Sequence, residues 1–217
     1  MKAEELERPE EIRIDERRKA GRPKGTGLNG RMRVLTPDEE ERLLVAADRD
    51  GAKYGLIIRL ILHLALRVSE VVSMRVEDFN ALSRPHQVTV RGAKGGFTRT
   101  YDLPDRLYGR YQRWMKRREP KDSPWLFPHR LYGRDEHMST AGVQGTFRVL
   151  CLKANIPGQH SVHDLRHTAA TRMAMSGDGV AQIAGRMRHR NVNSSQRYIE
   201  MRGNLEHDAV MMRRYKD

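Results

Sequence analysis

The sequence has a single cysteine, Cys151, so an internal disulfide and a zinc site built from cysteines of one chain are both excluded. It also lacks any run of about 18 apolar residues, the length that a membrane-spanning helix requires. The first 16 residues are highly charged and lack the apolar segment of a secretory signal peptide. These absences lead us to expect a protein of a reducing, cytosolic compartment.

Acidic residues are too few to balance the basic ones. The 217 residues include 41 Lys and Arg against 28 Asp and Glu, which gives a formal net charge of +13. This balance indicates a polyanionic partner, most simply nucleic acid, with an anionic membrane surface as the alternative. Hydrophobic residues make up 38% of the chain, which is enough for one sizeable core with an appended arm.

Residues 17–33 have a composition of their own, with seven basic residues and no acidic one. Because this stretch cannot bury much apolar surface, we expect a flexible basic arm. Its residues 21–25, Gly-Arg-Pro-Lys-Gly, are similar to half of an AT-hook, which lays arginine in the minor groove. A solvated linker that contacts phosphates without sequence preference is the simpler interpretation. The candidate DNA-contacting side chains are Arg22, Lys24, Arg31 and Arg33.

Helical periodicity dominates the chain after the arm. Thr36, Pro37 and Glu39 form a helix start with a capping box. A helix over 54–66 is apolar on most faces and is expected at the centre of the core. Further helices are expected over 69–74, 105–118, 140–154, 162–175, 180–187, 194–201 and, more weakly, 204–215.

Alternating polarity in two short segments, 87–91 and 98–103, predicts a β-hairpin around a glycine-rich turn. No internal repeat is found. The expected fold class is therefore α+β, mainly helical, with one small antiparallel sheet.

Three polar clusters interrupt the apolar pattern, and each is ambiguous when taken alone. Arg67 lies at the break between two apolar helices, a position that also fits an ordinary surface residue at a helix boundary. A histidine and an arginine three residues apart share one helix face, which also fits an ordinary polar face. A tyrosine on a late helix also fits a half-buried aromatic. The residues concerned are Arg67, His163 and Arg166 with His167 close by, and then His189 and Tyr198.

His163 and His167 have the spacing at which two histidines on a helix can bind zinc. The zinc-protease pattern needs a Glu after the first histidine and further ligands, whereas Asp164 and Arg166 stand here. Since a guanidinium between two ligands repels a cation, we expect no metal.

In this order the three clusters resemble the tyrosine recombinase family, also called phage integrases, whose hallmark is Arg, His-x-x-Arg, His or Trp, and Tyr. Residues 66–70, Leu-Arg-Val-Ser-Glu, are similar to the family's Leu-Arg-x-Ser-Glu box, and residues 163–168 are similar to its second box. The spacings of 23 residues from Arg166 to His189 and nine from His189 to Tyr198 fit bacterial members. The family also has a lysine in the hairpin turn, which Lys94 matches.

The resemblance implies a tyrosine recombinase catalytic-domain fold and a DNA strand transesterification that needs no metal or other cofactor. Tyr198 would attack the phosphorus, while Arg67 and Arg166 would hold the non-bridging oxygens. His167 would not touch the DNA itself and would act at most through a residue that does. The remaining implied roles are a general acid at Lys94, an acid or base toward Tyr198 at His163, and a hydrogen-bond donor to a phosphate oxygen at His189.

The sequence departs from the family pattern in two places. The usual Leu-Gly-His before the third box is Met-Arg-His here, so that Arg188 replaces a glycine that often ends a helix. The family's usual N-terminal core-binding domain has no counterpart before residue 34. The resemblance therefore implies a minimal member with a basic arm over 1–33, a catalytic domain over 34–202 and a tail helix over 203–217. Leu205, Ala209 and Met212 of the tail would pack either on a neighbouring copy or on the chain's own core.

The implied function is a site-specific DNA recombinase that forms a 3′-phosphotyrosyl intermediate. Its partners would be double-stranded DNA and further copies of the chain, as a tetramer on DNA, with no membrane. The chain would be of prokaryotic or phage origin and act at the nucleoid. The sequence specifies neither the DNA site, nor the outcome of recombination, nor whether an accessory DNA-bending protein takes part.

Two other functions stay open. A DNA-binding protein that kept the fold but lost strand exchange is disfavoured because all six family positions are filled. A relaxing enzyme similar to type IB topoisomerases shares the active-site logic. The bacterial spacing and the small size favour the recombinase over this enzyme.

Overall fold

A computed structural model describes residues 33–92, 98–129, 136–189 and 191–206, with the backbone alone for 203–206. The predicted arm up to residue 32, the hairpin turn that carries Lys94, and Ala209 and Met212 of the tail lie outside the described residues. The helices are α1 Pro37–Asp50, α2 Ala52–Leu64, α3 Val68–Val72, α4 Asp105–Met115, α5 Thr140–Lys153, α6 Val162–Met175, α7 Val180–Met187 and α8 Gln196–Glu206, with short 3-10 turns at Val76–Asp78 and Val192–Ser195. The strands are β1 Phe79–Asn80, β2 His86–Val90 and β3 Arg99–Leu103.

Helix α1 begins at the predicted capping box. The Thr36 hydroxyl accepts a hydrogen bond from the Glu39 backbone N–H at 3.2 Å, and the Glu39 carboxylate accepts one from the Thr36 N–H at 2.9 Å. Pro37 takes the first helical position, where its missing N–H costs nothing. The predicted helix start is confirmed.

Helix α2 is the centre of the core, as its apolar sequence predicts. It contacts α1, α3, α4 and α6. Leu56, Ile57, Leu60, Ile61 and Leu64 are fully buried along it. Packing on several sides holds α2 in place. The point at which the chain leaves α2 and turns into α3 is therefore held in place as well.

The predicted hairpin is present as β2 and β3, which pair antiparallel along their whole length with Val88 opposite Tyr101. The short strand β1 adds to the free edge of β2, so the sheet order is β1-β2-β3. A strand of two residues shows no alternation, so the sequence pattern did not predict β1. The predicted class, α+β and mainly helical with a small antiparallel sheet, is confirmed.

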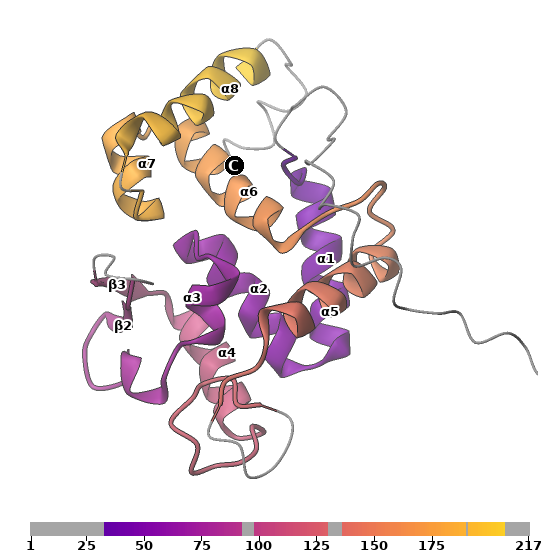
Figure 1. Ribbon diagram of the computed structural model, residues 1–217, viewed down its shortest axis with the longest axis vertical. Helices are drawn as coiled ribbons and strands as arrows, with labels where there is room; N and C mark the ends of the chain where they lie inside the picture. The colour runs from indigo at the N-terminus through magenta and orange to yellow at the C-terminus, as the bar shows by residue number, and fades with distance from the viewer. Residues whose placement is uncertain (1–32, 93–97, 130–135, 190, 207–217) are drawn as a thin grey trace, which may run out of the picture. The chain divides into compact units, whose positions relative to one another are not determined.

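Helices α6, α7 and α8 contact one another and lie together at the top of Figure 1, above α2 and α3. One helix, α8, runs from Gln196 to Glu206, so the predicted break between helices at 201 and 204 is wrong. The helix continues through Gly203, since helix interiors tolerate a single glycine at modest cost.

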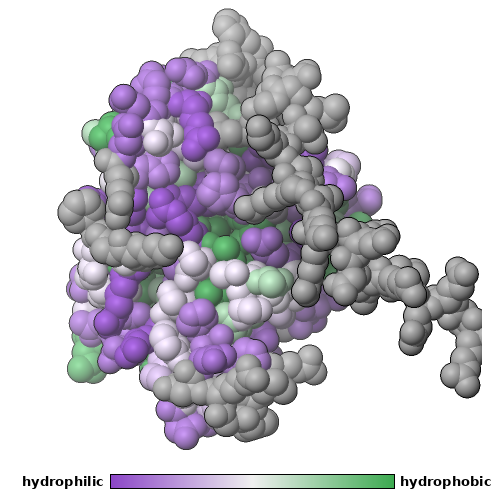
Figure 2. Space-filling model, viewed as in Figure 1, coloured by the Kyte–Doolittle hydropathy of each residue, from purple (hydrophilic) through white to green (hydrophobic). Residues whose placement is uncertain are grey.

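The face seen in Figure 2 is mainly hydrophilic, with hydrophobic patches of limited size. Among the described residues, the large hydrophobic side chains that are exposed are Val45, Leu82, Val149, Leu152 and Val192. No helix in this part of the chain combines the length and the apolar character needed to cross a membrane.

Candidate active site

The site begins at the break between α2 and α3. Ala65 caps α2 in the left-handed conformation, with φ 49°, so the chain leaves the helix axis abruptly. Arg67 then adopts an extended conformation as the N-cap of α3. The break frees the Ala65 carbonyl from helical pairing. Two arginines from distant segments donate to it, Arg166 at 2.5 Å and Arg188 at 3.1 Å.

Arg166 lies on α6 and is only 1% exposed. Its Nη1 donates to the Ala65 carbonyl, and its Nη2 donates to the Met187 carbonyl at the end of α7. One guanidinium thus joins the ends of α2 and α7 to the middle of α6. Burial, together with the charge of Arg67, lowers the pKa of Arg166 to about 9, which still leaves it charged at neutral pH.

Glu70 is a buried carboxylate that gathers three arginines. Arg67 Nη1 contacts its Oε1 at 2.8 Å, and Arg188 Nη2 contacts its Oε2 at 2.7 Å. Arg166 Nη1 lies farther away, 3.8 Å from Oε2. Although burial opposes ionisation, the bond and charge of Arg188 hold the pKa of Glu70 below its usual value. In the sequence Glu70 was only part of a recognisable motif, and the structure shows that it links the arginines of the site.

Tyr198, the predicted nucleophile, has no exposed surface. Its hydroxyl is hydrogen-bonded to His167 Nδ1 at 2.8 Å. Burial raises the pKa of Tyr198, while the charges of Arg197 and Arg166 oppose that rise. The sequence suggested at most a half-buried ring, and it gave His167 no direct contact with the tyrosine; the structure differs on both points. The spacing of His163 and His167 carried the missed signal, since it places both rings on one helix face.

Three histidines surround the arginines and the tyrosine. The rings of His163 and His167 meet edge to face, with centroids 4.4 Å apart. Burial, with neighbouring positive charges, lowers the pKa of His163, that of His167 to about 3 and that of His189 to about 4. All three are therefore mainly neutral at pH 7, the form that can accept a proton or a hydrogen bond. His189 Nδ1 is held by the hydroxyl of Ser195 at 2.8 Å.

Five of the six predicted catalytic residues lie close enough together for their charges to affect one another's pKa. The pKa of His189 falls chiefly through burial and then through Arg166 and Arg67, with His163 contributing further. Arg166 also acts on Tyr198. Lys94 lies outside the described residues, as do Arg22, Lys24 and Arg31. Arg33 is described, and its guanidinium donates to the Gln159 carbonyl.

Arg197 is a further cation that the sequence did not single out. It is exposed beside the candidate nucleophile, with its guanidinium 5.5 Å from the centre of the Tyr198 ring. Its charge lowers the pKa of Tyr198 and of the three histidines. Guanidiniums that are permanently charged, neutral imidazoles and a phenol form a suitable set for binding a phosphate and attacking its phosphorus. No three metal-ligating side chains come together in the part of the chain that the structure describes.

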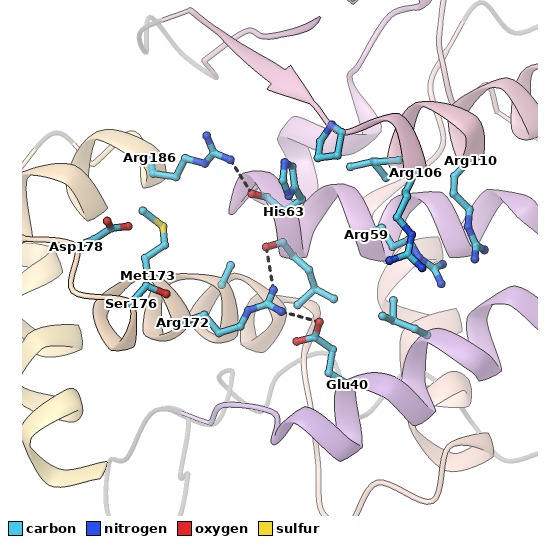
Figure 3. Close-up of a pocket in the computed structure, with 15 residues that line it drawn as sticks. Glu40, Arg59, His63, Arg106, Arg110, Arg172, Met173, Ser176, Asp178 and Arg186 are labelled. Carbon is cyan, nitrogen blue, oxygen red and sulfur yellow. Dashed lines mark hydrogen bonds and ion pairs between the residues drawn. The ribbon is translucent and has the colours of Figure 1, made fainter. Parts of the chain in front are cut away.

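Apart from this site, a hollow of about 820 Å³ lies between α1, α2, α4, α6 and α7 (Figure 3). Arginines dominate its lining, but most of them are held by acceptors of the chain itself. Arg172 pairs with Glu40 at 2.8 Å, and Arg186 donates to the His63 carbonyl at 3.0 Å. None of the described candidate catalytic residues lines this hollow.

A mainly helical domain that gathers arginines, histidines and a buried tyrosine in this way is the kind of domain that tyrosine recombinases contain. The chain belongs to the phage integrase family, because residues 33–204 match the profile of that family. It is 31% identical over 176 residues to tyrosine recombinase XerA of Pyrococcus furiosus, covering 81% of this chain and 60% of the relative. The chain thus spans less than two thirds of the length of that relative.

Solved structures share the fold. The crystal structure of XerA recombinase superposes with a TM-score of 0.67 at 23% identity, covering 81% of this chain and 65% of that one. XerH site-specific recombinase, bound to its palindromic difH substrate after cleavage, gives a TM-score of 0.69 at 20% identity, covering 82% and 52%. At these identities the likeness shows the fold alone.

Proposed function

We propose that this chain is a site-specific DNA recombinase that cuts and rejoins strands through a 3′-phosphotyrosyl intermediate on Tyr198. The observation that carries the proposal is the convergence of Arg67, Arg166 and Tyr198 from α3, α6 and α8 on one site with three neutral histidines. Membership of the phage integrase family supports it. So does the likeness to a XerH structure described as a post-cleavage complex with difH DNA.

The proposed reaction exchanges one phosphodiester for another. The Tyr198 oxygen forms a bond to phosphorus, the bond to the 5′-oxygen breaks, and Lys94 supplies the proton of the leaving 5′-hydroxyl. Arg67 and Arg166 stabilise the charge on the non-bridging oxygens, and losing one such donor typically costs about 10²–10³ in rate. A 5′-hydroxyl of the partner strand then attacks the phosphotyrosine and reverses the step.

The buried Tyr198 represents a resting state in this proposal. A free phenol has a pKa near 10, so only about 0.1% is ionised at neutral pH, and burial raises that pKa further. The hydroxyl must leave His167 and reach a bound phosphate, where the arginines favour the phenolate. In this proposal His163, whose ring meets that of His167 edge to face, takes the proton of the phenol, and His189 bonds a phosphate oxygen.

The assembly that we propose is a tetramer on double-stranded DNA, formed from chains that are monomeric without DNA. The division into an arm, a catalytic domain over 34–202 and a tail over 203–217 is supported by the family match over 33–204. Analytical ultracentrifugation with and without a cognate site tests this assembly. Truncation after Met201 should spare single-site binding and reduce tetramer formation.

A plasmid assay tests the function and separates the alternatives. A supercoiled plasmid carries two copies of a repeat that flanks the gene, with a plasmid lacking the repeats as the control. A recombinase excises or inverts the intervening segment only between repeats. Relaxation of both plasmids without exchange would indicate the topoisomerase-like enzyme. Binding without either product would indicate a DNA-binding protein that has lost strand exchange.

A further inference from the structure

Arg188 occupies a backbone position that disfavours its side chain. It caps α7 in the left-handed conformation, with φ 54° and ψ 43°, where a residue with a Cβ is strained and glycine is not. The family motif that this segment resembles has a glycine here. An arginine at this position requires a compensating interaction of its side chain.

That interaction is a buried network. The Arg188 side chain is only 2% exposed. Its Nη2 donates to Glu70 Oε2 at 2.7 Å and to the Ala65 carbonyl at 3.1 Å, and its Nη1 donates to the Tyr101 hydroxyl at 3.0 Å. The guanidinium therefore connects the end of α7 with the break before α3 and with strand β3.

Arg188 shares two of the three partners of Arg166, the Ala65 carbonyl and Glu70. The Ala65 carbonyl accepts from both guanidiniums, and Glu70 Oε2 is 2.7 Å from Arg188 Nη2 but 3.8 Å from Arg166 Nη1. Without Arg188, the buried Glu70 carboxylate would face Arg67 and Arg166 alone. Glu70 Oε2 would have lost its charged partner at 2.7 Å, and because a buried charge attracts the nearest cation strongly, Arg166 would move toward it.

We infer that Arg188 is a positioning residue for the proposed strand-cleavage site. Its guanidinium pairs with Glu70 Oε2, so that Arg166 keeps donors available for the scissile phosphate, while Arg67 already pairs with Oε1 through one nitrogen. With glycine at this position, Glu70 would draw on Arg166 as well as on Arg67. The inference rests on the proposed function for its role in cleavage, but the arrangement of the arginines can be tested without DNA.

The experiment compares the full chain with R188G, R188K and the double variant E70Q/R188G. Inorganic phosphate is titrated and followed by NMR of the arginine Nε–H groups, and covalent adduct formation is timed on a nicked DNA substrate. We expect R188G to bind phosphate about tenfold more weakly, the change for one missing charge-assisted donor. Its adduct should form about 10- to 100-fold more slowly, the range expected when reacting groups are displaced.

Two further variants separate positioning from loss of fold. E70Q/R188G should regain part of the phosphate affinity, because no carboxylate is left to draw Arg166 away. R188K keeps the positive charge but lacks the planar guanidinium that bonds several acceptors at once. Its phosphate affinity should lie between those of wild type and R188G. R118A is the matched control, since Arg118 is 3% exposed and donates to three loop carbonyls around 121–125. It should lower the unfolding temperature and leave phosphate affinity unchanged.

Wild-type phosphate affinity in a folded R188G would overturn the inference, and so would equal affinities of R188G and E70Q/R188G. If wild type forms no adduct on any substrate, the proposed function fails instead. The phosphate titrations would then still decide whether Arg188 positions the arginines.

Discussion

At the scale of single residues, the proposed nucleophile is stored inside the protein. Tyr198 has no exposed surface and its hydroxyl is bonded to His167, so the tyrosine of the described conformation cannot reach a DNA phosphate. Activation therefore requires exchange of one hydrogen bond for another. The exchange of hydrogen bonds alone costs on the order of 1 kcal/mol, because a new partner replaces the old one, and exposing the buried ring adds to this cost.

Protonation of His167 makes the free energy of unfolding depend on pH. The pKa of His167 is lowered to about 3, chiefly by burial, whereas a histidine in the unfolded chain titrates near 6.5. Between these values the unfolded chain binds more protons, so the free energy of unfolding falls as the pH drops below about 6.5. At about pH 5 the loss from His167 should be about 2 kcal/mol.

Urea unfolding of wild type and H167N at about pH 7.5 and about pH 5 measures this contribution. Asn keeps a group that can bond the Tyr198 hydroxyl but does not titrate. H167N should therefore lose clearly less stability on acidification than wild type. Equal losses in the two proteins would show that His167 is not the group responsible.

Candidate residues could be named from the sequence, because Arg67 lies in a recognisable local motif and because the spacings from Arg166 to His189 and from His189 to Tyr198 are those of the family. What could not be predicted depends on backbone conformation. Arg188 looked like a departure at a helix end. Only its left-handed φ and its bond to Glu70 show that its guanidinium points into the core. The spacing of His167 was visible, but its contact with Tyr198 depends on the packing of α8 against α6.

At the scale of elements, a helix or strand could be predicted where its own residues carry the signal. The capping box of Thr36 and Glu39 predicted the start of α1, and alternation predicted the pairing of β2 with β3. The extent of α8 was not predicted in this way, because the sequence pattern was divided into two helices over 194–201 and 204–215. Nor was the left-handed break at Ala65, since alanine favours the helix that it here ends.

The capping box allows a test of how much the cap of α1 contributes to the free energy of unfolding. T36A removes the hydroxyl that accepts from the Glu39 N–H and should lower the free energy of unfolding by about 0.5–2 kcal/mol. T36S keeps the hydroxyl and serves as the control, which should stay close to wild type. Chemical denaturation measures both. An unchanged T36A would mean that tertiary packing, chiefly on α2 and α5, holds α1 without help from the cap.

The β2–β3 hairpin carries the proposed general acid, because Lys94 lies in its turn. If Lys94 protonates the leaving 5′-oxygen, K94A should slow adduct formation by about 10²–10⁴, the usual contribution of general acid catalysis. A substrate with sulfur in place of the bridging 5′-oxygen needs no such proton, since a thiolate leaves readily. K94A should therefore cleave the sulfur substrate nearly as fast as wild type. Equal defects of K94A on both substrates would assign Lys94 to DNA binding instead.

At the scale of the whole molecule, a stretch whose charged residues are all basic precedes the catalytic domain. Residues 17–32 hold six basic residues and no acidic one, directly before the match to the family. We expect deletion of residues 1–32 to weaken DNA binding and to flatten its dependence on salt. Each phosphate that the protein no longer neutralises should reduce the slope of log K against log salt by about 0.9.

The deletion spares Arg33, whose guanidinium bonds the Gln159 carbonyl, and Leu35, which is fully buried. The folded part should therefore remain stable, which circular dichroism checks. A slope that does not change on deletion would show that the arm does not touch DNA. Replacing the six basic residues by glutamine in the full chain separates the effect of charge from that of length.

The identity of the nucleophile is tested most directly by trapping the covalent intermediate. A nicked substrate that releases its 5′ end irreversibly is incubated with wild type, Y198F and Y215F in the presence of EDTA. We expect a protein–DNA adduct on the 3′-phosphate for wild type and Y215F. Y198F should form none while binding DNA nearly as well as wild type, because it lacks one hydroxyl only. An adduct formed by Y198F, or one that requires a divalent metal, would contradict the mechanism.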